Sequence, residues 1–319
     1  MKNVNKTILI LLLASITIAF AGWEPKVDVP TLPEGKGVKD GGALVTNGDY
    51  IYAFQGGNTY NFFAYSLLDM TWSAKCSIPY VLKPTGRPDK KRVKSGGALT
   101  VYEGKIYAFK GGNTYEFWAY DPGLNDWAQQ ASISEGLNRK RVKHGGALVT
   151  LGDAIYAFKG GNTDEFWMYD PLATTWFPKA SLVTVDGKKI KGGAALTAYN
   201  GIIYAFVGGN SYHFYAYDPA SDVWNQKADV GFGNLEKRVK DGASLVEKSG
   251  FLYAFKGGNT QDFGYYDVAG DVWVTLDTIP MGVNERRVKA GGSLTAYGDV
   301  IYALKGGNSK EFWAYTIVK

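Results

Sequence analysis

Lys110-Gly-Gly-Asn-Thr-Tyr-Glu-Phe-Trp-Ala-Tyr-Asp121, preceded by Ile106-Tyr-Ala-Phe109, contains two apolar and aromatic runs separated by a diglycine. Two such runs on either side of a glycine turn are typical of a β-hairpin. The unit recurs along the chain at intervals of 55, 49, 48, 49 and 49 residues, with diglycines that begin at Gly56, Gly111, Gly160, Gly208, Gly257 and Gly306. Nearly the whole chain is therefore built from six copies of one unit.

A period near 50 residues with strand-forming composition predicts a β-propeller. Each copy carries four strand signals: a short glycine-rich segment (Val38–Leu44 in the first copy), a Tyr-centred strand, a third aromatic strand, and a fourth that begins at a tryptophan. These tryptophans are Trp72, Trp127, Trp176, Trp224 and Trp273. We predict an all-β fold in which six four-stranded antiparallel blades form one domain, residues 22–319.

The sixth copy has no fourth strand of its own, because the chain ends at Lys319. Trp23 lies 49 residues before Trp72, one repeat length, and Trp23–Lys26 closely matches Trp176–Lys179. We therefore predict that the N-terminal segment joins the last blade and closes the ring. Closure also protects strand edges that would otherwise pair with other chains.

Residues 1–21 have the pattern of a secretory signal peptide. Lys2 and Lys6 precede an apolar run, Ile8–Phe20, and Ala19-Phe-Ala21 provides small residues for cleavage. The run is shorter than the roughly 20 residues that span a bilayer. We predict a mature protein without a membrane span, secreted to the periplasm, the cell surface or the medium. Its 33 Lys and Arg, left when Lys2 and Lys6 are removed, against 30 Asp and Glu do not favour nucleic acid as a partner.

The repeats resemble those of the kelch-repeat β-propellers in four features: the Tyr of Ile-Tyr-Ala-Phe, the diglycine, Tyr-Asp-Pro, and the spaced Trp. The resemblance covers residues 23–319. It departs in a constant Asn after the diglycine and a constant Lys two residues before the first-strand glycine. The resemblance implies an interaction module, although some secreted or periplasmic kelch propellers are enzymes, including galactose oxidase and a bacterial sialic acid mutarotase. Fold alone does not choose between these roles.

In such a blade, the diglycine loop and the loop that enters the next blade lie at the same end of the ring, which we call the glycine end. A ring of cations there would concentrate positive potential over the channel. The candidate ligand-binding residues are Lys39, Lys94, Lys143, Lys191, Lys240, Lys289, Arg92, Arg141, Arg238, Arg287, Asn113 and Asn162. We expect a protein partner or an acidic or glycan ligand, and self-association stays open. Alternatively, the lysines lie along a neighbouring blade and find a carboxylate or carbonyl there, and the asparagines serve only a left-handed turn.

Four hairpins also carry a lysine before the diglycine and an acid six residues later. The pairs are Lys110 with Glu116, Lys159 with Glu165, Lys256 with Asp262, and Lys305 with Glu311. The first and fourth copies lack both partners and have Gln55 with Asn61 and Val207 with His213. Joint presence and joint loss predict a cross-strand ion pair, worth about 0.2–1 kcal/mol each.

The sequence favours a non-catalytic protein without a metal or cofactor. It has two histidines, His144 and His213, one cysteine, Cys76, and no clustered acidic loop. A copper site like that of galactose oxidase would need two histidines at one metal, and zinc or calcium sites need other clusters. The alternative is a carbohydrate-active enzyme similar to the mutarotase, for which Glu116 or Glu165 beside an arginine would supply acid–base chemistry.

One connection between repeats is longer than the rest. Trp72 and Val93 are 21 residues apart, where the other junctions have 14 or 15, and the added segment Leu82–Lys91 is basic and contains two prolines. We expect this loop to emerge at the glycine end and overhang one sector of the channel mouth.

Overall fold

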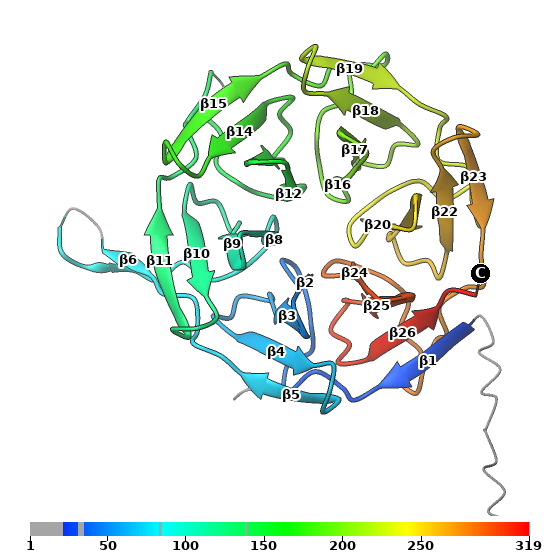
Figure 1. The fold of residues 1–319 in the computed structure, drawn as a ribbon, viewed down its shortest axis with the longest axis horizontal. Coiled ribbons are helices and arrows are strands. Elements are labelled where there is room, and N and C mark those ends of the chain that lie inside the picture. Colours follow the sequence, from blue (N-terminus) through cyan, green and yellow to red (C-terminus); the bar gives the residue numbers. More distant parts are fainter. Residues whose placement is uncertain (1–21, 31–34, 83–84, 138, 319) are drawn as a thin grey trace, which may run out of the picture.

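The computed structural model describes the chain except for residues 1–21, 31–34, 83–84, 138 and 319. The expected signal peptide lies outside the described residues. The described part forms six four-stranded antiparallel sheets around a central axis (Figure 1), which confirms the predicted six-bladed propeller. None of its segments is a helix long and apolar enough to cross a membrane.

The first three blades follow the chain from the axis outward. Blade 1 contains β2 (Ala43–Asn47), β3 (Tyr50–Phe54), β4 (Phe62–Ser66) and β5 (Thr71–Ala74). Blade 2 contains β8 (Ala98–Tyr102), β9 (Lys105–Phe109), β10 (Phe117–Asp121) and β11 (Asp126–Gln130). Blade 3 contains β12 (Ala147–Leu151), β13 (Ala154–Phe158), β14 (Phe166–Asp170) and β15 (Thr175–Lys179).

The last three blades repeat this order, except that the outer strand of blade 6 comes from the N-terminal segment. Blade 4 contains β16 (Ala195–Tyr199), β17 (Ile202–Phe206), β18 (Phe214–Asp218) and β19 (Val223–Gln226). Blade 5 contains β20 (Ser244–Lys248), β21 (Phe251–Phe255), β22 (Phe263–Asp267) and β23 (Val272–Thr275). Blade 6 contains β24 (Ser293–Tyr297), β25 (Val300–Leu304), β26 (Phe312–Thr316) and β1 (Gly22–Lys26).

The pairing of β1 with β26 confirms the predicted closure. Trp23 lies opposite Tyr315, and its ring packs 4.8 Å from that of Phe263 in blade 5. Its indole N–H donates to the carbonyl of Asp277 at 3.0 Å. The other five blade tryptophans each donate in the same way to the connector that leaves the preceding blade. Trp23 is therefore a full member of the repeat, although it comes from the opposite end of the chain.

Replacing Trp23 by Ala should destabilise the whole ring, because it removes both the indole contact with blade 5 and the bond to its connector. We expect a loss of about 3 kcal/mol in the free energy of unfolding, measured by urea denaturation. Glu24 of the same strand is exposed. The control variant Glu24→Ala should therefore change the free energy of unfolding by less than about 0.5 kcal/mol. Equal stability of the two variants would contradict the closure argument.

The expected first strand, Val38–Leu44, is wrong at its start, since β2 begins at Ala43. Val38 instead forms an isolated bridge with Ser309 of blade 6, and the same bridge recurs at every junction. The chain then turns, with the amide of Gly42 donating to the carbonyl of Lys39 at 2.6 Å. The part of the segment from Val38 to Gly42 is therefore a link between blades, and only Ala43 and Leu44 belong to the strand.

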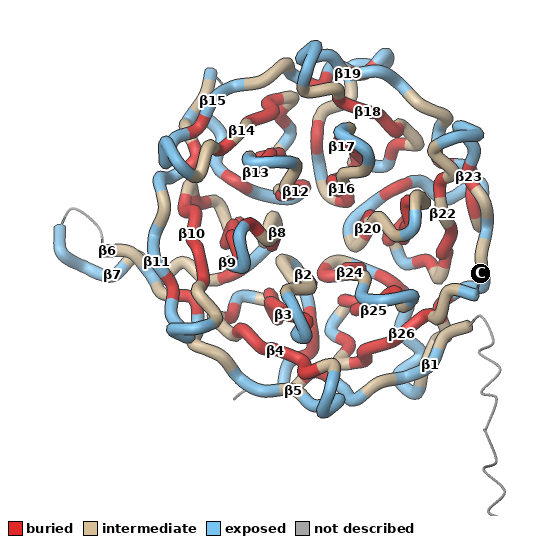
Figure 2. The backbone as a smooth tube through the Cα atoms, viewed as in Figure 1, coloured by how far each residue is buried: buried red, intermediate tan, exposed pale blue. Residues whose placement is uncertain are grey.

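The core lies between neighbouring blades, where buried residues concentrate on the inner three strands, while the outer strands are largely exposed (Figure 2). Aromatic rings from two blades meet there: Phe117 packs against both Tyr169 and Trp176 at 4.9 Å. Burial raises the pKa of the Tyr169 hydroxyl to about 12, with a smaller contribution from nearby Tyr107. The pKa values of Tyr253 and Tyr302 are also raised to about 12, chiefly by burial.

These tyrosines should limit stability at alkaline pH. A tyrosine of the unfolded chain ionises near pH 10, whereas the buried hydroxyls stay protonated up to about pH 12, so the folded state binds more protons in this window. Stability is then fully present below about pH 10 and falls as the pH rises toward 12. The melting temperature, measured together with tyrosinate absorbance at about 295 nm, should drop between pH 9 and pH 11.5. An unchanged melting temperature over this range would contradict the assignment.

The inserted segment forms a small hairpin of β6 (Val81–Leu82) and β7 (Pro88–Asp89). Figure 1 shows this hairpin projecting outward from the rim of the ring. The expectation that the loop overhangs the channel mouth is therefore wrong. The two strands pair with each other beyond blade 2 and do not turn toward the axis.

Candidate functional site

The six predicted ring lysines lie at the junctions between blades, just before the strands nearest the axis. At one junction, Val93 bridges to Thr59 of blade 1. The amide of the next residue, Lys94, then donates to the carbonyl of Lys110 in blade 2 at 3.1 Å. Each lysine is thus bonded to its own blade directly after a residue that bridges to the preceding blade, which places all six at one end of the ring.

A glycine of the neighbouring blade fixes each lysine backbone. Gly41 has a φ of 84°, and a Cβ at this position would lie 2.1 Å from the carbonyl oxygen of Lys94. The same close approach occurs around the ring, up to Gly291 against Lys39 at 2.2 Å. Only glycine fits such a contact. The inner loops therefore form a closed circle that sets the positions of the six lysines.

The lysine side chains are exposed, and their stems lie on their own blade. A Cβ added to Gly57, the second glycine of the blade 1 hairpin, would be 3.1 Å from the Cβ of Lys39 and 3.6 Å from its Cδ. Within the described part of the chain, no carboxylate lies within 4.0 Å of any of the six ammonium groups. The alternative in which each lysine finds a carboxylate on a neighbouring blade therefore has no support.

Three of the four predicted arginines have aromatic partners away from the channel. The guanidinium groups of Arg92, Arg141 and Arg238 lie 5.3, 5.3 and 5.0 Å from the ring centres of Tyr60, Tyr115 and Tyr212, respectively. At the junction of blades 3 and 4 the same place holds an ion pair, Lys189 with Asp164 at 2.5 Å. At the junction of blades 5 and 6, the fourth predicted arginine, Arg287, is exposed. Cation–π stacking and ion pairing thus replace one another at this position, which indicates a role in joining blades.

Asn113 and Asn162 adopt left-handed backbone conformations, with φ of 67° and 68°. The equivalent asparagines of the other blades do so too, which agrees with the turn role. Some members of the set also line a cavity: Asn162 and Asn210 line one pocket, and Asn58 lines another. Asn113 lines neither of these pockets.

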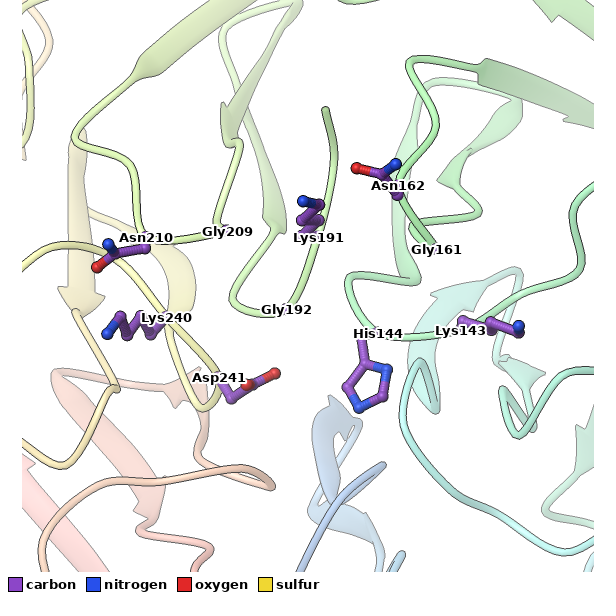
Figure 3. A pocket seen from close by; sticks show the side chains of 10 residues that line it. All are labelled: Lys143, His144, Gly161, Asn162, Lys191, Gly192, Gly209, Asn210, Lys240 and Asp241. Carbon is purple, nitrogen blue, oxygen red and sulfur yellow. The ribbon is translucent and has the colours of Figure 1, made fainter. Parts of the chain in front are cut away.

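The first pocket lies over blades 3, 4 and 5 at the glycine end and has a volume of about 610 Å³. Lys143, Lys191 and Lys240 border it, together with Asn162, Asn210, His144 and Asp241. Figure 3 shows Asp241 and His144 on either side of Gly192, with the Asp241 carboxylate directed toward the side on which His144 lies. A second pocket of about 420 Å³ lies over blades 6, 1 and 2 and is bordered by Lys39, Lys94 and Lys289.

Sequence reasoning missed the residues that directly follow the ring lysines. They line the channel mouth and differ from blade to blade: Asp40, Ser95, His144, Gly192, Asp241 and Ala290. The sequence signal that could have found them is that the position after each constant ring lysine varies, while the residues around it are nearly the same in every repeat. The position of the Asp241 carboxylate requires a glycine at residue 192, because a Cβ on Gly192 would lie 1.9 Å from the Asp241 Oδ1. The Ser95 hydroxyl donates to Asp40 at 3.1 Å.

The four hairpin ion pairs are present and more deeply buried than expected. Lys110 and Lys159 are 0% exposed and lie 2.6 and 2.5 Å from Glu116 and Glu165. Lys256 lies 3.8 Å from Asp262, and Lys305 also contacts Glu311. Burial lowers the pKa of Lys110, Lys256 and Lys305, while the acidic partner opposes this shift. The expected 0.2–1 kcal/mol is the contribution of an exposed pair, whereas removing one partner of a buried pair costs about 3–5 kcal/mol because the other charge is left buried without its partner.

Each buried lysine also holds the connector that enters its blade. Lys159 donates to the carbonyls of Ser134 and Glu135 at 3.0 and 2.8 Å, and Lys305 to those of Pro280 and Met281. In blade 1 neutral groups make the same network, because Asn61 donates to Gln55 and Gln55 donates to the carbonyl of Lys36.

Blade 4 has a different network, in which His213 lies between Asp186 and Asp229 at 3.0 and 3.3 Å. Hydrogen bonds, the strongest from Lys188, lower the pKa of Asp186. Both carboxylates belong to the connectors on either side of blade 4. His213 therefore contacts the connectors on both sides of its blade, whereas the buried lysines described above bind the connector that enters their blade.

The proposed catalytic carboxylates are both engaged in buried ion pairs. The side chains of Glu116 and Glu165 are 8% and 10% exposed, and each is bound to its lysine. Burial, with a contribution from Asp126, raises the pKa of the Cys76 thiol, which does not favour a thiolate nucleophile. Among the described residues no group of three His, Cys, Asp or Glu is placed to hold a metal ion.

The fold and this end-on arrangement define a six-bladed β-propeller with a cationic ring around one channel mouth. A solved structure titled "Structure of YjhT" is 13% identical, matches 92% of this chain and 95% of its own, and superposes with a TM-score of 0.61. That likeness shows the fold alone. No protein-family description and no curated protein matches the sequence.

The buried pairs should behave as units. Lys159→Gln alone leaves Glu165 buried without its cation, and we expect a loss of about 3 kcal/mol. Combining it with Glu165→Asn imitates the neutral pair of blade 1, so the double variant should lose clearly less than the sum of the two single losses. A double-mutant cycle by urea denaturation measures this coupling. Additive losses would mean that the two side chains act independently.

Proposed function

We propose that this protein is a secreted, non-catalytic binding propeller of the kelch type, which holds an anionic ligand in the glycine-end pocket over blades 3, 4 and 5. The main support is that three exposed lysines border one pocket. Within the part of the chain that the structure describes, no carboxylate oxygen lies within 4.0 Å of their ammonium nitrogens. The kelch assignment is supported by the repeated motif, and secretion by the pattern of residues 1–21.

The chemistry of the pocket indicates what such a ligand carries. Ammonium groups bind carboxylates or sulfates as point charges, and the amides of Asn162 and Asn210 add donors and acceptors. Asp241 accepts hydrogen bonds, so a ligand with hydroxyl or amide donors beside its anionic group fits best. Carboxylated or sulfated glycans and acidic peptide segments both meet this description.

Charge reversal should separate the two halves of the ring. The triple variant Lys143→Glu, Lys191→Glu and Lys240→Glu should weaken binding of an acidic oligosaccharide, selected on a glycan and polyanion array, by at least about tenfold. Lys39→Glu, Lys94→Glu and Lys289→Glu make the same charge change around the other pocket and should have a smaller effect. Raising the salt concentration should weaken the unmodified protein as well. Equal losses in both triple variants would contradict a site confined to blades 3–5.

A second function is favoured by the presence of Asp241 and His144 in the lining of one pocket (Figure 3). A carboxylate and an imidazole near one bound sugar would supply acid–base chemistry for a carbohydrate-active, mutarotase-like enzyme. NMR of anomer ratios distinguishes this function from simple binding. Turnover that Asp241→Asn abolishes, with retained ligand affinity, would establish the enzyme and overturn the non-catalytic proposal.

A further inference from the structure

The connectors between blades present isolated aliphatic side chains at the glycine end, outside the lysine ring. Leu137, Leu235 and Val283 occupy similar places in three connectors and are 101%, 64% and 93% exposed. Val185 of the connector between blades 3 and 4 is 78% exposed. Each of these four side chains, which we call the tips, therefore projects from the ring and is not covered by its own chain.

These tips stand on firmly held loops. Buried Ile133, in the connector of Leu137, donates its amide to the carbonyl of Tyr115 at 3.0 Å. Just before the tip, Gly136 packs so closely that a Cβ would lie 2.6 Å from the carboxylate of buried Glu165. Gly282, before Val283, has the same relation to Glu311. The buried ion pairs thus support the tips from beneath, so that their exposure is a built feature of the fold.

Cations flank every one of these tips. The basic residues that follow them are Arg139, Lys140 and Arg141; Lys188 and Lys189; Lys237 and Arg238; and Arg286 and Arg287. The opposite end of the ring also exposes aliphatic residues, Leu68, Leu124 and Leu172, at 85%, 77% and 86%. There, however, aspartates share the turns, as Asp121 does with Leu124. Acidic residues stand beside the glycine-end tips as well, namely Glu135, Asp186, Glu236 and Glu285, but at that end the six ring lysines add further positive charge.

We infer that the glycine end docks on the surface of a bilayer that contains anionic phospholipids. Single projecting side chains need a partner that they can penetrate, which the boundary between headgroups and acyl chains provides. The surrounding lysines and arginines then meet the phosphates of the headgroups. A rigid protein face would instead need a fitted pocket for each tip. This inference goes beyond the pocket proposal, because it rests on the rim and not on the ring lysines of blades 3–5.

The test uses the protein from Gly22 to Lys319, which contains every strand of the six blades, so that the apolar run Ile8–Phe20 cannot bind lipid itself. Sedimentation with vesicles of phosphatidylcholine containing phosphatidylglycerol should carry the protein down, whereas vesicles of phosphatidylcholine alone should not. The triple variant Leu137→Ser, Leu235→Ser and Val283→Ser keeps every charge and should lose at least tenfold in partitioning. Its melting temperature should be unchanged.

Leu68→Ser, Leu124→Ser and Leu172→Ser form the matched control at the opposite end and should leave partitioning intact. A fluorophore attached to Leu137→Cys in a Cys76→Ser background should shift to the blue on the anionic vesicles. The inference is overturned if the protein does not sediment with these vesicles, if both triple variants lose binding equally, or if the fluorophore does not respond. Concentration-dependent assembly in ultracentrifugation that either triple variant abolishes would identify a second copy as the partner instead. Binding of the acidic oligosaccharide should be unaffected by the rim variant, which separates failure of this inference from failure of the pocket proposal.

Discussion

The contact between each axial glycine and a lysine carbonyl of the next blade is the constraint on which the ring depends. At Gly41 a Cβ would overlap the carbonyl oxygen of Lys94, and the last such contact, Gly291 with Lys39, returns to the first blade. Because the contacts form a closed circle, no single blade can shift without opening two junctions. The cationic ring is a by-product of this packing: the residue whose backbone is clamped is the one that sends its side chain to solvent.

The buried ion pairs connect stability with the functional surface. Lys159 is held by Glu165 and in turn holds the carbonyls of Ser134 and Glu135 in the connector above it. The ring of Trp167 lies 5.3 Å from the same ammonium group. In blade 5 a glycine stands at the corresponding position, Gly264, and the connector's Phe232 provides the ring beside Lys256 at 5.1 Å. The buried lysine of blade 5 thus keeps an aromatic neighbour, although its own strand has a glycine where the strands of blades 2, 3 and 6 have a tryptophan.

Specificity depends on departures from symmetry. Six equal lysines make an anion site without orientation, but of the two pockets that these lysines border, His144 lines the one over blades 3–5 and not the one over blades 6, 1 and 2. The neighbouring Gly192 leaves the room that Asp241 occupies. Each of the two pockets therefore combines three lysines with one aspartate, and the pocket over blades 3–5 differs from the other by the imidazole of His144.

The repeat alone determined much of this protein. The period predicted six blades, the isolated Trp23 predicted the closing strand, and the joint loss at Gln55 with Asn61 predicted the paired positions across the hairpin. These features could be predicted because each repeats a local pattern of strand, turn and charge. The depth of the ion pairs, the outward course of the β6–β7 hairpin and the convergence of His144 and Asp241 on one pocket depend on tertiary structure. They join residues of different blades or different connectors, and burial and convergence around an axis leave no trace in the local pattern of any one repeat.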